Sequence, residues 1–351
     1  MVLPRKSVYY GLIIITFLLS AFLEFIHQPL LLFVMDSIAV IFTASLLGKA
    51  TESIAYYAGD RLGGFLNATF GNAAELIIAV FLVKDGLLDV VKASITGSII
   101  GNLLLVLGLS VLLGGIRHKQ QRFNHMLASH NASLMTIAVI ALFVPAVFMA
   151  NLGLPQIELL SIVIASLLII TYMLWLFFSM VTHRGELSDT GQNDRHEKPE
   201  WGMWTSLVLL VAATVLVAFE SEWLVGSIEI VASALGWSEI FVGAFVVAIV
   251  GNAAEHSAAV MLAMKNKIGA AVEIAVGSSL QIALFVAPVL VFISLILQQP
   301  MNLVFTTIEL TAIGVSAFIA KSISFDGATN WYEGVLLLVV YIILGTAFYF
   351  A

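Results

Sequence analysis

Apolar stretches separated by short polar breaks follow one another along the whole chain. Eleven of them are about 20 residues long or more, which is the length that an α-helix needs to cross a bilayer. Their approximate bounds are Tyr10–Phe25, Leu30–Tyr57, Leu62–Val83, Val90–Leu113, Ala128–Ala150, Leu154–Val181, Trp204–Leu235, Ile240–Met264, Gly269–Leu297, Leu303–Ala320 and Tyr332–Phe350. The second and seventh are long enough to be tilted or broken. The pattern predicts an all-α polytopic membrane protein with about 11 transmembrane helices.

One five-residue sequence, Gly-Asn-Ala-Ala-Glu, occurs twice inside these stretches. It runs from Gly71 to Glu75 and again from Gly251 to Glu255, an offset of 180 residues. A Gly-Ser pair begins 26 residues after the first glycine of each copy, at Gly97 and at Gly277. The chain therefore contains an internal duplication. A carboxylate near the middle of a spanning helix costs about 2.5 to 3.5 kcal/mol on insertion scales, so we expect the two glutamates to have a function.

The basic residues predict how the helices are oriented. They fall mainly in every second loop, and the positive-inside rule then places the N-terminus in the cytoplasm and the C-terminus outside. Arg61 precedes the first pentapeptide, whereas Lys265 and Lys267 follow the second, so the two copies run in opposite directions. One extra N-terminal helix followed by two inverted five-helix repeats, with broken helices at the centre, is the plan of many secondary transporters.

This plan divides the chain into four parts. Residues 1–27 form the extra transmembrane helix, 28–182 the first repeat, 183–202 a cytoplasmic linker and 203–351 the second repeat. Arg5 and Lys6 precede the first apolar stretch as in a signal peptide, but no small-x-small cleavage site follows, so we expect a retained helix. The hydrophilic linker is interpreted as a solvated loop, in preference to a regulatory metal sensor.

Composition supports a membrane protein and excludes several functions. Hydrophobic residues make up 61% of the chain and charged residues 11%, where a soluble domain has roughly 25% charged residues. The net charge of -7 comes without any basic run, which argues against nucleic acid as a partner. The absence of cysteine excludes disulfides, thiolate metal sites and a cysteine nucleophile.

The duplicated segments present oxygen atoms near the predicted bilayer centre. Positions i and i+3 share a helix face, so each repeat pairs an amide with a carboxylate. Hydroxyl and amide side chains follow both Gly-Ser pairs, and Ser279 adds another hydroxyl. Such an all-oxygen shell suits a hard cation, because Ca²⁺ takes about 6 to 8 oxygen ligands and Mg²⁺ a strict octahedron. The candidate metal ligands are Glu75, Glu255, Asn72, Asn252, Ser98, Ser278, Gln281 and Asn102.

Other interpretations compete at several positions. The small residues of the pentapeptides favour helix packing, and Asn or Ser can bond a neighbouring helix. Glu52 pairs with Lys49 in one interpretation and admits cations in another, while Asp36 has no obvious partner. His256 points about 100° away from Glu255 around a helix, which favours packing over ligation. The remaining acids expected at helix ends or vestibules are Glu222, Glu229, Glu273 and Glu309.

These motifs resemble the calcium/proton exchangers of the cation/calcium antiporter superfamily over nearly the whole chain. The resemblance rests on both pentapeptides, Gly97-Ser98, Gly277–Gln281, Thr51-Glu52 and Leu66–Phe70. It implies that Glu75 and Glu255 bind Ca²⁺ and exchange protons, with nearby Asn, Ser and Gln side chains shaping the site. Sodium-coupled relatives typically have Thr-Ser-Pro-type residues around the acid, and this chain has Asn-Ala-Ala instead. The linker lacks the dense acidic run of many relatives.

A mechanism follows from the charges of the two glutamates. Two like charges close together in a poorly hydrated site cannot both persist once the metal leaves, so protons should replace Ca²⁺ and let the empty protein rearrange. We therefore expect a secondary transporter that exports cytosolic Ca²⁺ in exchange for H⁺ by alternating access. The alternatives are a Na⁺/Ca²⁺ or other divalent-cation exchanger of the same architecture and a cation channel.

No enzyme signature accompanies these residues. A zinc protease would need His-Glu-x-x-His, and His196-Glu197 lacks the second histidine, so we expect a protein that is not an enzyme. We expect no cofactor, Ca²⁺ being a transported substrate. The expected partners are Ca²⁺, H⁺ and the lipid bilayer, with no nucleic acid and with a homo-oligomer left open. The short loops favour a prokaryotic plasma membrane.

Overall fold

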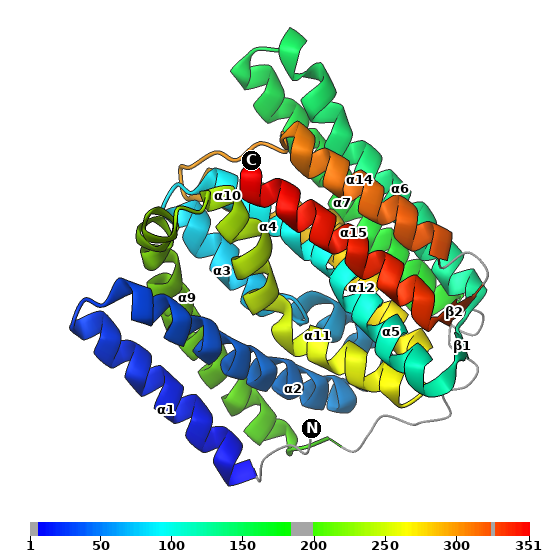
Figure 1. Ribbon diagram of the computed structural model, residues 1–351, viewed down its shortest axis with the longest axis horizontal. Coiled ribbons are helices and arrows are strands. Elements are labelled where there is room, and N and C mark those ends of the chain that lie inside the picture. The colour runs from blue at the N-terminus through cyan, green and yellow to red at the C-terminus, as the bar shows by residue number, and fades with distance from the viewer. Residues whose placement is uncertain (1–5, 184–198, 324–326) are drawn as a thin grey trace.

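The computed structural model describes residues 6–183, 199–323 and 327–351, and these residues are almost entirely helical (Figure 1). The first half contains α1 (Lys6–Phe25), α2 (Pro29–Phe70), α3 (Ala73–Lys84), α4 (Leu88–Ile100), η1 (Gly101–Val106), α5 (Leu107–His118), β1 (Gln120–Arg122), α6 (His125–Phe148), η2 (Met149–Asn151), α7 (Leu154–Phe177) and η3 (Phe178–Thr182). The second half contains α9 (Met203–Leu235), α10 (Glu239–Phe241), η4 (Val242–Val247), α11 (Ala248–Met264), α12 (Ile268–Gln281), η5 (Ile282–Val286), α13 (Ala287–Ile296), α14 (Thr307–Ile323), β2 (Ala328–Asn330) and α15 (Trp331–Phe350). The linker predicted at 183–202 falls mostly outside the described residues.

The structure supports an integral membrane protein but not the count of eleven spans. Within the described residues, nine helical runs are long and apolar enough to cross a membrane. The predicted span Leu303–Ala320 contains only the 17-residue α14, because residues 302–306 are not helical. The predicted span Leu62–Val83 is not one helix, since it consists of the end of α2 and the whole of α3. The predicted all-helical, polytopic class is confirmed.

The first pentapeptide lies where the helix is interrupted. α2 bends at Gly59, whose φ of 79° and ψ of 170° lie in a region that only glycine adopts readily. α2 then ends at Phe70, a turn covers Gly71 and Asn72, and α3 begins at Ala73. The second pentapeptide differs, because α11 runs through Gly251 and Asn252 without interruption. The prediction of broken helices at the centre therefore holds for the first copy, whereas the second has a π-helical segment, η4, just before it.

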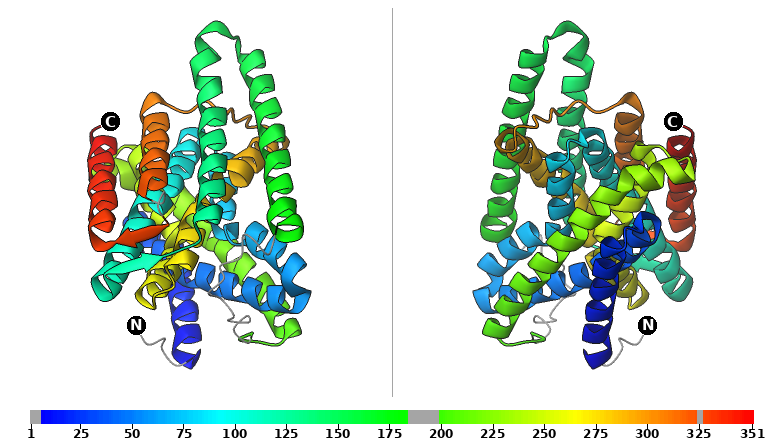
Figure 2. Two further views of the ribbon diagram at one scale, coloured as in Figure 1. Left: turned by 90° about the vertical axis from the view of Figure 1, so that its right-hand side faces the viewer. Right: turned by 90° about the vertical axis from the view of Figure 1, so that its left-hand side faces the viewer.

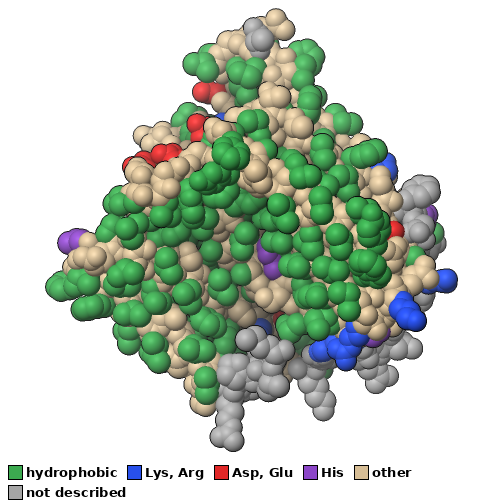
Figure 3. All heavy atoms as spheres, viewed as in Figure 1, with side chains coloured by type: hydrophobic (Ala, Val, Ile, Leu, Met, Phe, Trp, Pro, Cys, Tyr) green, Lys and Arg blue, Asp and Glu red, His purple; other side chains and the backbone are tan. Residues whose placement is uncertain are grey.

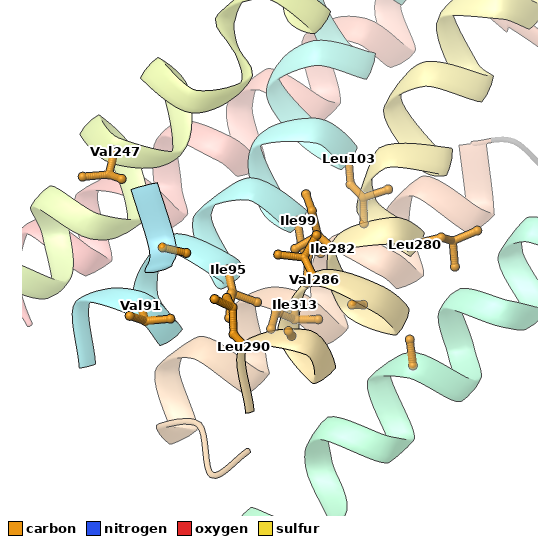
Figure 4. Packing of buried hydrophobic residues seen from close by; sticks show 14 of the residues in the cluster. Val91, Ile95, Ile99, Leu103, Val247, Leu280, Ile282, Val286, Leu290 and Ile313 are labelled. Atoms are coloured by element: carbon orange, nitrogen blue, oxygen red, sulfur yellow. The ribbon is translucent and has the colours of Figure 1, made fainter. Parts of the chain in front are cut away.

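The long helices α2 and α9 pack against each other, and α1 lies against this pair (Figure 1). α6 and α7 form a hairpin that extends beyond the rest of the molecule (Figure 2). Between these parts, apolar side chains of α4 at every fourth position face a similar row on η5 and α13, as Val91, Ile95, Ile99, Ile282 and Leu290 illustrate (Figure 4). This buried layer holds α4 and α12 in place, and both helices carry candidate site residues.

The outer surface of the molecule is mostly apolar. Hydrophobic side chains cover most of the face in Figure 3, with Lys and Arg gathered mainly at one edge and Asp and Glu at the opposite edge. Near the C-terminal end of α5, β1 pairs antiparallel with β2, and Gln121 donates from Nε2 to the Ala263 carbonyl at 2.9 Å and to Asn266 Oδ1 at 3.0 Å. This small sheet connects α5 and α15 with the end of α11.

Glycine allows the two halves to approach closely between α4 and η4. A Cβ at Gly97 would collide with the backbone of Ala244, and a Cβ at Gly243 would come within 2.8 Å of the Val90 carbonyl oxygen. Small residues permit such contacts between membrane helices, where dispersion and hydrogen bonding drive association. The glycine equivalent to Gly97 in the second repeat, Gly277, has open space where its Cβ would lie.

We predict that Gly97→Ala and Gly277→Ala have opposite effects on stability. Gly97→Ala should lower the free energy of unfolding by about 1 to 3 kcal/mol, because the methyl group meets backbone that cannot move aside. Gly277→Ala should leave it unchanged or raise it by about 0.5 to 1 kcal/mol, because alanine favours the helix. Thermal unfolding of the two purified variants in the same detergent measures the difference, and equal melting temperatures would contradict the packing argument.

Candidate functional site

Each repeat positions its glutamate beside a serine of the following helix. Glu75 lies in the first turn of α3, directly after the Gly71–Asn72 turn, and its Oε1 accepts a hydrogen bond from Ser98 of α4. Glu255 lies within α11, and its Oε2 accepts a hydrogen bond of 2.5 Å from Ser278 of α12. The two pairs are equivalent at the offset of 180 residues. The duplicated letters of the sequence therefore build duplicated contacts.

The two repeats also contact each other reciprocally. The Cβ position of Gly71 is 3.2 Å from Glu255 Oε1, and that of Gly251 is 3.7 Å from the Cα, Cβ and Cγ atoms of Glu75. Such an exchange of equivalent contacts is what a two-fold relation between the repeats produces. The glycines leave the space that each acid of the other repeat occupies. The structure thus brings Glu75 and Glu255 into one site, where their charges act on each other.

Amide side chains complete the connection between the halves. Asn252 donates from Nδ2 to Glu75 Oε1 at 2.9 Å and to Ser98 Oγ at 3.1 Å, so it joins the second repeat to the acid of the first. Asn72 donates from Nδ2 to Gln281 Oε1 at 2.7 Å. Gln281 has no counterpart in the first repeat, because Gly101 occupies the equivalent position. The site is therefore symmetric in its acids and asymmetric in its amides.

Several oxygens in this site are buried and have no hydrogen-bond partner among the described residues. They are Oε2 of Glu75, whose residue is 6% exposed, and Oδ1 of Asn72, whose residue is 5% exposed. Neither Glu75 nor Glu255 forms a salt bridge with a Lys or Arg of the described part of the chain. Buried acids and amides normally have a partner, because leaving them bare costs desolvation energy. These oxygens can be satisfied by a cation or by protons.

The donor set determines which cation fits. The site offers two carboxylates, amide oxygens and hydroxyl oxygens, and no group of three or more His, Cys, Asp or Glu suited to a metal occurs among the described residues. Neutral and charged oxygens without nitrogen or sulfur favour Ca²⁺ or Mg²⁺ over zinc or copper. The flexible amides and the turn at Gly71 and Asn72 suit the adaptable shell of Ca²⁺ better than the strict octahedron of Mg²⁺.

Asn102 and its neighbour take different roles from those predicted. Asn102 is buried and shares a hydrogen bond of 3.0 Å between its Oδ1 and His256 Nε2, with no printed contact to either acid. His256 therefore has a polar partner across the repeats and does not merely pack. Ser279 donates to the Ala275 carbonyl of its own helix at 2.9 Å. Of the eight candidate ligands, seven are joined by the contacts of the two acids and their amides, and Asn102 lies beside them through His256.

The other acids separate into exposed and buried groups. Glu52 is exposed and acts electrostatically on Glu255, while Lys49 Nζ lies 4.7 Å above the ring of Tyr9. Glu309 is buried, and its Oε2 accepts hydrogen bonds from the backbone and the hydroxyl of Thr306 at 2.7 and 2.8 Å. The acids exposed as expected of helix ends or vestibules are Glu222, Glu229 and Glu273.

Sequence reasoning did not single out Glu220, although this residue is 0% exposed. Glu220 accepts a hydrogen bond of 2.5 Å from Thr43 of α2. Its counterpart at the offset of 180 residues is Val40, so the duplication gave no signal for it. The only available signal was an acid in a long apolar stretch, which Glu220 shares with Glu222 two residues later.

Comparison with known proteins gives consistent matches along the chain. The profile of the sodium/calcium exchanger protein family matches residues 28–181 and 205–350. The chain is 48% identical over 335 residues to the Ca(2+)/H(+) antiporter ChaA of Bacillus subtilis (strain 168), covering 94% of this chain and 95% of that protein. It is 46% identical over 365 residues to the Ca(2+)/H(+) antiporter of Aphanothece halophytica, covering 99% and 98%. The solved structure of native YfkE has a TM-score of 0.86 at 42% identity and covers 98% of this chain and 100% of that one.

We predict that Asn252→Ala weakens Ca²⁺ binding to the purified protein by about tenfold or more. The substitution removes the amide that holds Glu75 toward the second repeat, and a hydrogen bond to a charged group contributes about 1.5 to 3 kcal/mol. Isothermal titration calorimetry measures the change. The matched control is Ser257→Ala on the same helix, because Ser257 is exposed and bonds only the Ala253 carbonyl of α11. Equal weakening in both variants would point to damage to α11 in place of a lost contact.

Proposed function

Because the chain belongs to the sodium/calcium exchanger protein family, we propose that it is a secondary transporter that exchanges Ca²⁺ for H⁺ across a membrane. Its relatives named as Ca(2+)/H(+) antiporters align over nearly their full length at 46 to 48% identity. The resemblance noted in the sequence to calcium/proton exchangers is thereby confirmed. The observation that carries the proposal is the meeting of Glu75 and Glu255 in one buried site that has oxygen ligands and no basic partner.

Charge balance couples the two ions. Two ionised glutamates in a poorly hydrated site cost several kcal/mol each unless a counter-charge is present. One Ca²⁺ supplies that charge, with Glu75 and Glu255 as ligands and Asn72, Asn252, Ser98, Ser278 and Gln281 as neutral oxygen donors or positioning groups. When Ca²⁺ leaves, protons bind the same carboxylates. The two ions compete for the same oxygens, so their movements are opposed.

The difference between the repeats supports alternating access. The first copy of the pentapeptide lies at a helix interruption, and the second lies in a continuous helix. In transporters built from inverted repeats, exchanging the conformations of the two repeats opens the site to the other side of the membrane. We infer that α2, α3 and α11 exchange these roles during the cycle, while α4 and α12 keep Ser98 and Ser278 beside the acids.

The wider assignment follows from the same reasoning. The chain is an integral membrane protein, and we propose a prokaryotic plasma membrane as its location, with the N-terminus cytoplasmic and the C-terminus outside. In this orientation a proton gradient that is acid outside drives cytosolic Ca²⁺ outward. The chain then divides as 1–27, 28–182, 183–202 and 203–351. Beyond Ca²⁺, H⁺ and lipid it needs no cofactor or nucleic acid, and self-association into a homo-oligomer is compatible with its apolar surface.

We predict that Glu75→Gln and Glu255→Gln each abolish proton-driven Ca²⁺ uptake into vesicles while leaving a folded protein. Glutamine keeps the size of the side chain and its bond to the neighbouring serine, but it removes the charge that binds Ca²⁺ and accepts a proton. Uptake of radioactive Ca²⁺ after a pH jump measures the loss. The control is Asp89→Asn, because Asp89 is an exposed acid that pairs with Lys92 at 2.9 Å. Proton-driven uptake retained in both glutamine variants would remove the two acids from the mechanism.

A sodium gradient should not replace the proton gradient. The alternative of Na⁺/Ca²⁺ exchange shares the architecture, but this chain places Asn-Ala-Ala between glycine and glutamate in both repeats. We predict that vesicles loaded with Na⁺ at equal pH on both sides take up less than about one tenth of the Ca²⁺ that a pH gradient drives, corresponding to at least about 1.4 kcal/mol of discrimination. The same flux assay with the two gradients imposed separately decides between the exchangers, and equal uptake would favour the sodium-coupled one.

A further inference from the structure

A second pair of buried acids lies apart from the site formed by Glu75 and Glu255. Asp36 on α2 and Glu220 on α9 are both 0% exposed, and their charges act on each other. They belong to the two longest helices of the protein, which pack against each other and against α1. None of the roles proposed above uses either residue. A buried pair of acids within membrane helices is a candidate for function, because an isolated charge there is costly.

Most of the oxygens in this pair have no hydrogen-bond partner. Thr43 of α2 donates to Glu220 Oε2 at 2.5 Å, which joins α2 to α9. Glu220 Oε1 and both carboxylate oxygens of Asp36 have no partner among the described residues. Ser20 of α1, also 0% exposed, faces Asp36, yet its hydroxyl has no hydrogen bond either. Three of the four carboxylate oxygens therefore point into a buried space without a donor.

No described basic group neutralises these acids. The neighbouring charged group on α1 is Glu24, a half-buried acid that acts on Asp36 and adds further negative charge. On α3, Lys84 is bound to Glu222 at 2.8 Å on the exposed surface of the protein. On the other helices packed against α2 and α9, the titratable groups face elsewhere: Lys49 lies over Tyr9, Tyr9 donates to the Phe42 carbonyl, and Glu255 and His256 face the central site.

The chemistry of the pair favours a proton over a metal ion. The central site combines its acids with amide oxygens and an interrupted helix, whereas Asp36 and Glu220 lie in uninterrupted parts of α2 and α9 whose backbone carbonyls are used within the helix. Only the hydroxyls of Thr43 and Ser20 lie nearby, and Thr43 is already a donor. Ca²⁺ requires about 6 to 8 oxygens. A proton neutralises a carboxylate without any coordination shell and turns it into the missing donor for its neighbour.

We propose that Asp36 and Glu220 form a second proton-binding site, separate from the Ca²⁺ site, whose occupancy controls how α2 and α9 pack. When the pair is protonated, one acid can donate to the other and hold the two helices together. When both acids are ionised, their repulsion and the cost of burying two charges separate the helices or admit water.

The pair has a definite side of the membrane, unlike the central site. At the offset of 180 residues its members correspond to Leu216 and Val40, so the second repeat contains no copy of it. Asp36 lies about 10 Å along α2 from its start, on the side of the turn between α1 and α2. Glu220 is two residues from the exposed Glu222 and Lys84 pair. A site present once, close to one surface, responds to the pH of that surface, which is the outer one in the orientation proposed above.

Infrared spectroscopy of the purified protein tests the bound proton directly. In the Glu75→Gln/Glu255→Gln background, which removes the central acids, we expect a protonated carboxyl band at neutral pH that decreases in alkali. Either Asp36→Asn or Glu220→Gln should remove this band, whereas Glu222→Gln should leave it unchanged. If the background variant does not fold, difference spectra between the unsubstituted protein and the Asp36→Asn variant give the same comparison. This measurement does not depend on which ions the central site carries.

Three results would overturn the proposal. The first is a spectrum in which both acids are ionised at neutral pH. The second is a band that persists unchanged from acid to alkaline pH, because the pair would then be a permanent structural contact. The third is Ca²⁺ binding to the background variant that calorimetry detects and Asp36→Asn abolishes, because the ligand would then be a metal ion.

Transport supplies a second readout, which rests on the proposed Ca²⁺/H⁺ exchange. Asp36→Asn and Glu220→Gln imitate the protonated pair, so their exchange rate should lose its dependence on the pH at the surface near the α1–α2 turn. Glu222→Gln should keep that dependence. If exchange itself is absent from the unsubstituted protein, the proposed function fails while the infrared result stands. An unchanged pH dependence in both amide variants would remove the pair from control of the cycle.

Discussion

The burial of negative charge among membrane helices is the constraint on which this structure depends. A carboxylate in such a place requires a counter-charge, a proton or a set of donors, and the described basic residues supply none to Glu75 and Glu255. Each acid receives one serine hydroxyl, and Asn252 adds an amide to Glu75. These donors are too few to stabilise two full charges. The requirement for an exchangeable cation is therefore built into the fold and gives the protein its transport chemistry.

The glycines of the duplicated segment solve a steric problem that this constraint creates. Two acids can share one cation only if helices from opposite repeats approach within a side chain's reach. Gly71 and Gly251 provide that approach, because each leaves room for the acid of the other repeat. Gly97 does the same for the contact of α4 with η4. In a lipid environment, where apolar burial does not drive helices together, such close contacts determine where the polar residues meet.

Sequence reasoning identified the acids, their serines and the joining of the repeats because these features are duplicated and polar. An identical word at a fixed offset within apolar segments identifies both the repeat and its function. It could not give the helix boundaries, since Leu62–Val83 is uniformly apolar although a turn at Gly71 and Asn72 interrupts it. It placed Asn102 with the ligands because the residue follows the Gly-Ser pair, but the bond to His256 depends on a contact between α11 and η1 that only the folded chain defines. Glu220 escaped notice because duplication was the main criterion and this acid is not duplicated.

The departures from symmetry explain how a duplicated protein can work in one direction. Perfectly equivalent repeats would give a site with the same energy toward either side of the membrane, and the ion gradients alone would then set the direction of transport. Here Gln281 faces Gly101, Asn102 faces Ile282, and the acids on α2 and α9 have apolar counterparts, so the two half-cycles differ in their polar contacts. The amide of Gln281 holds Asn72 at the interrupted helix, a contact that the equivalent state of the other repeat cannot form because Gly101 has no side chain. The conformation with the first pentapeptide interrupted is therefore stabilised by a contact of its own. Such a bias leaves the thermodynamic coupling of the ions unchanged, but it determines which half-cycle is slow and thus at which surface pH can control the rate.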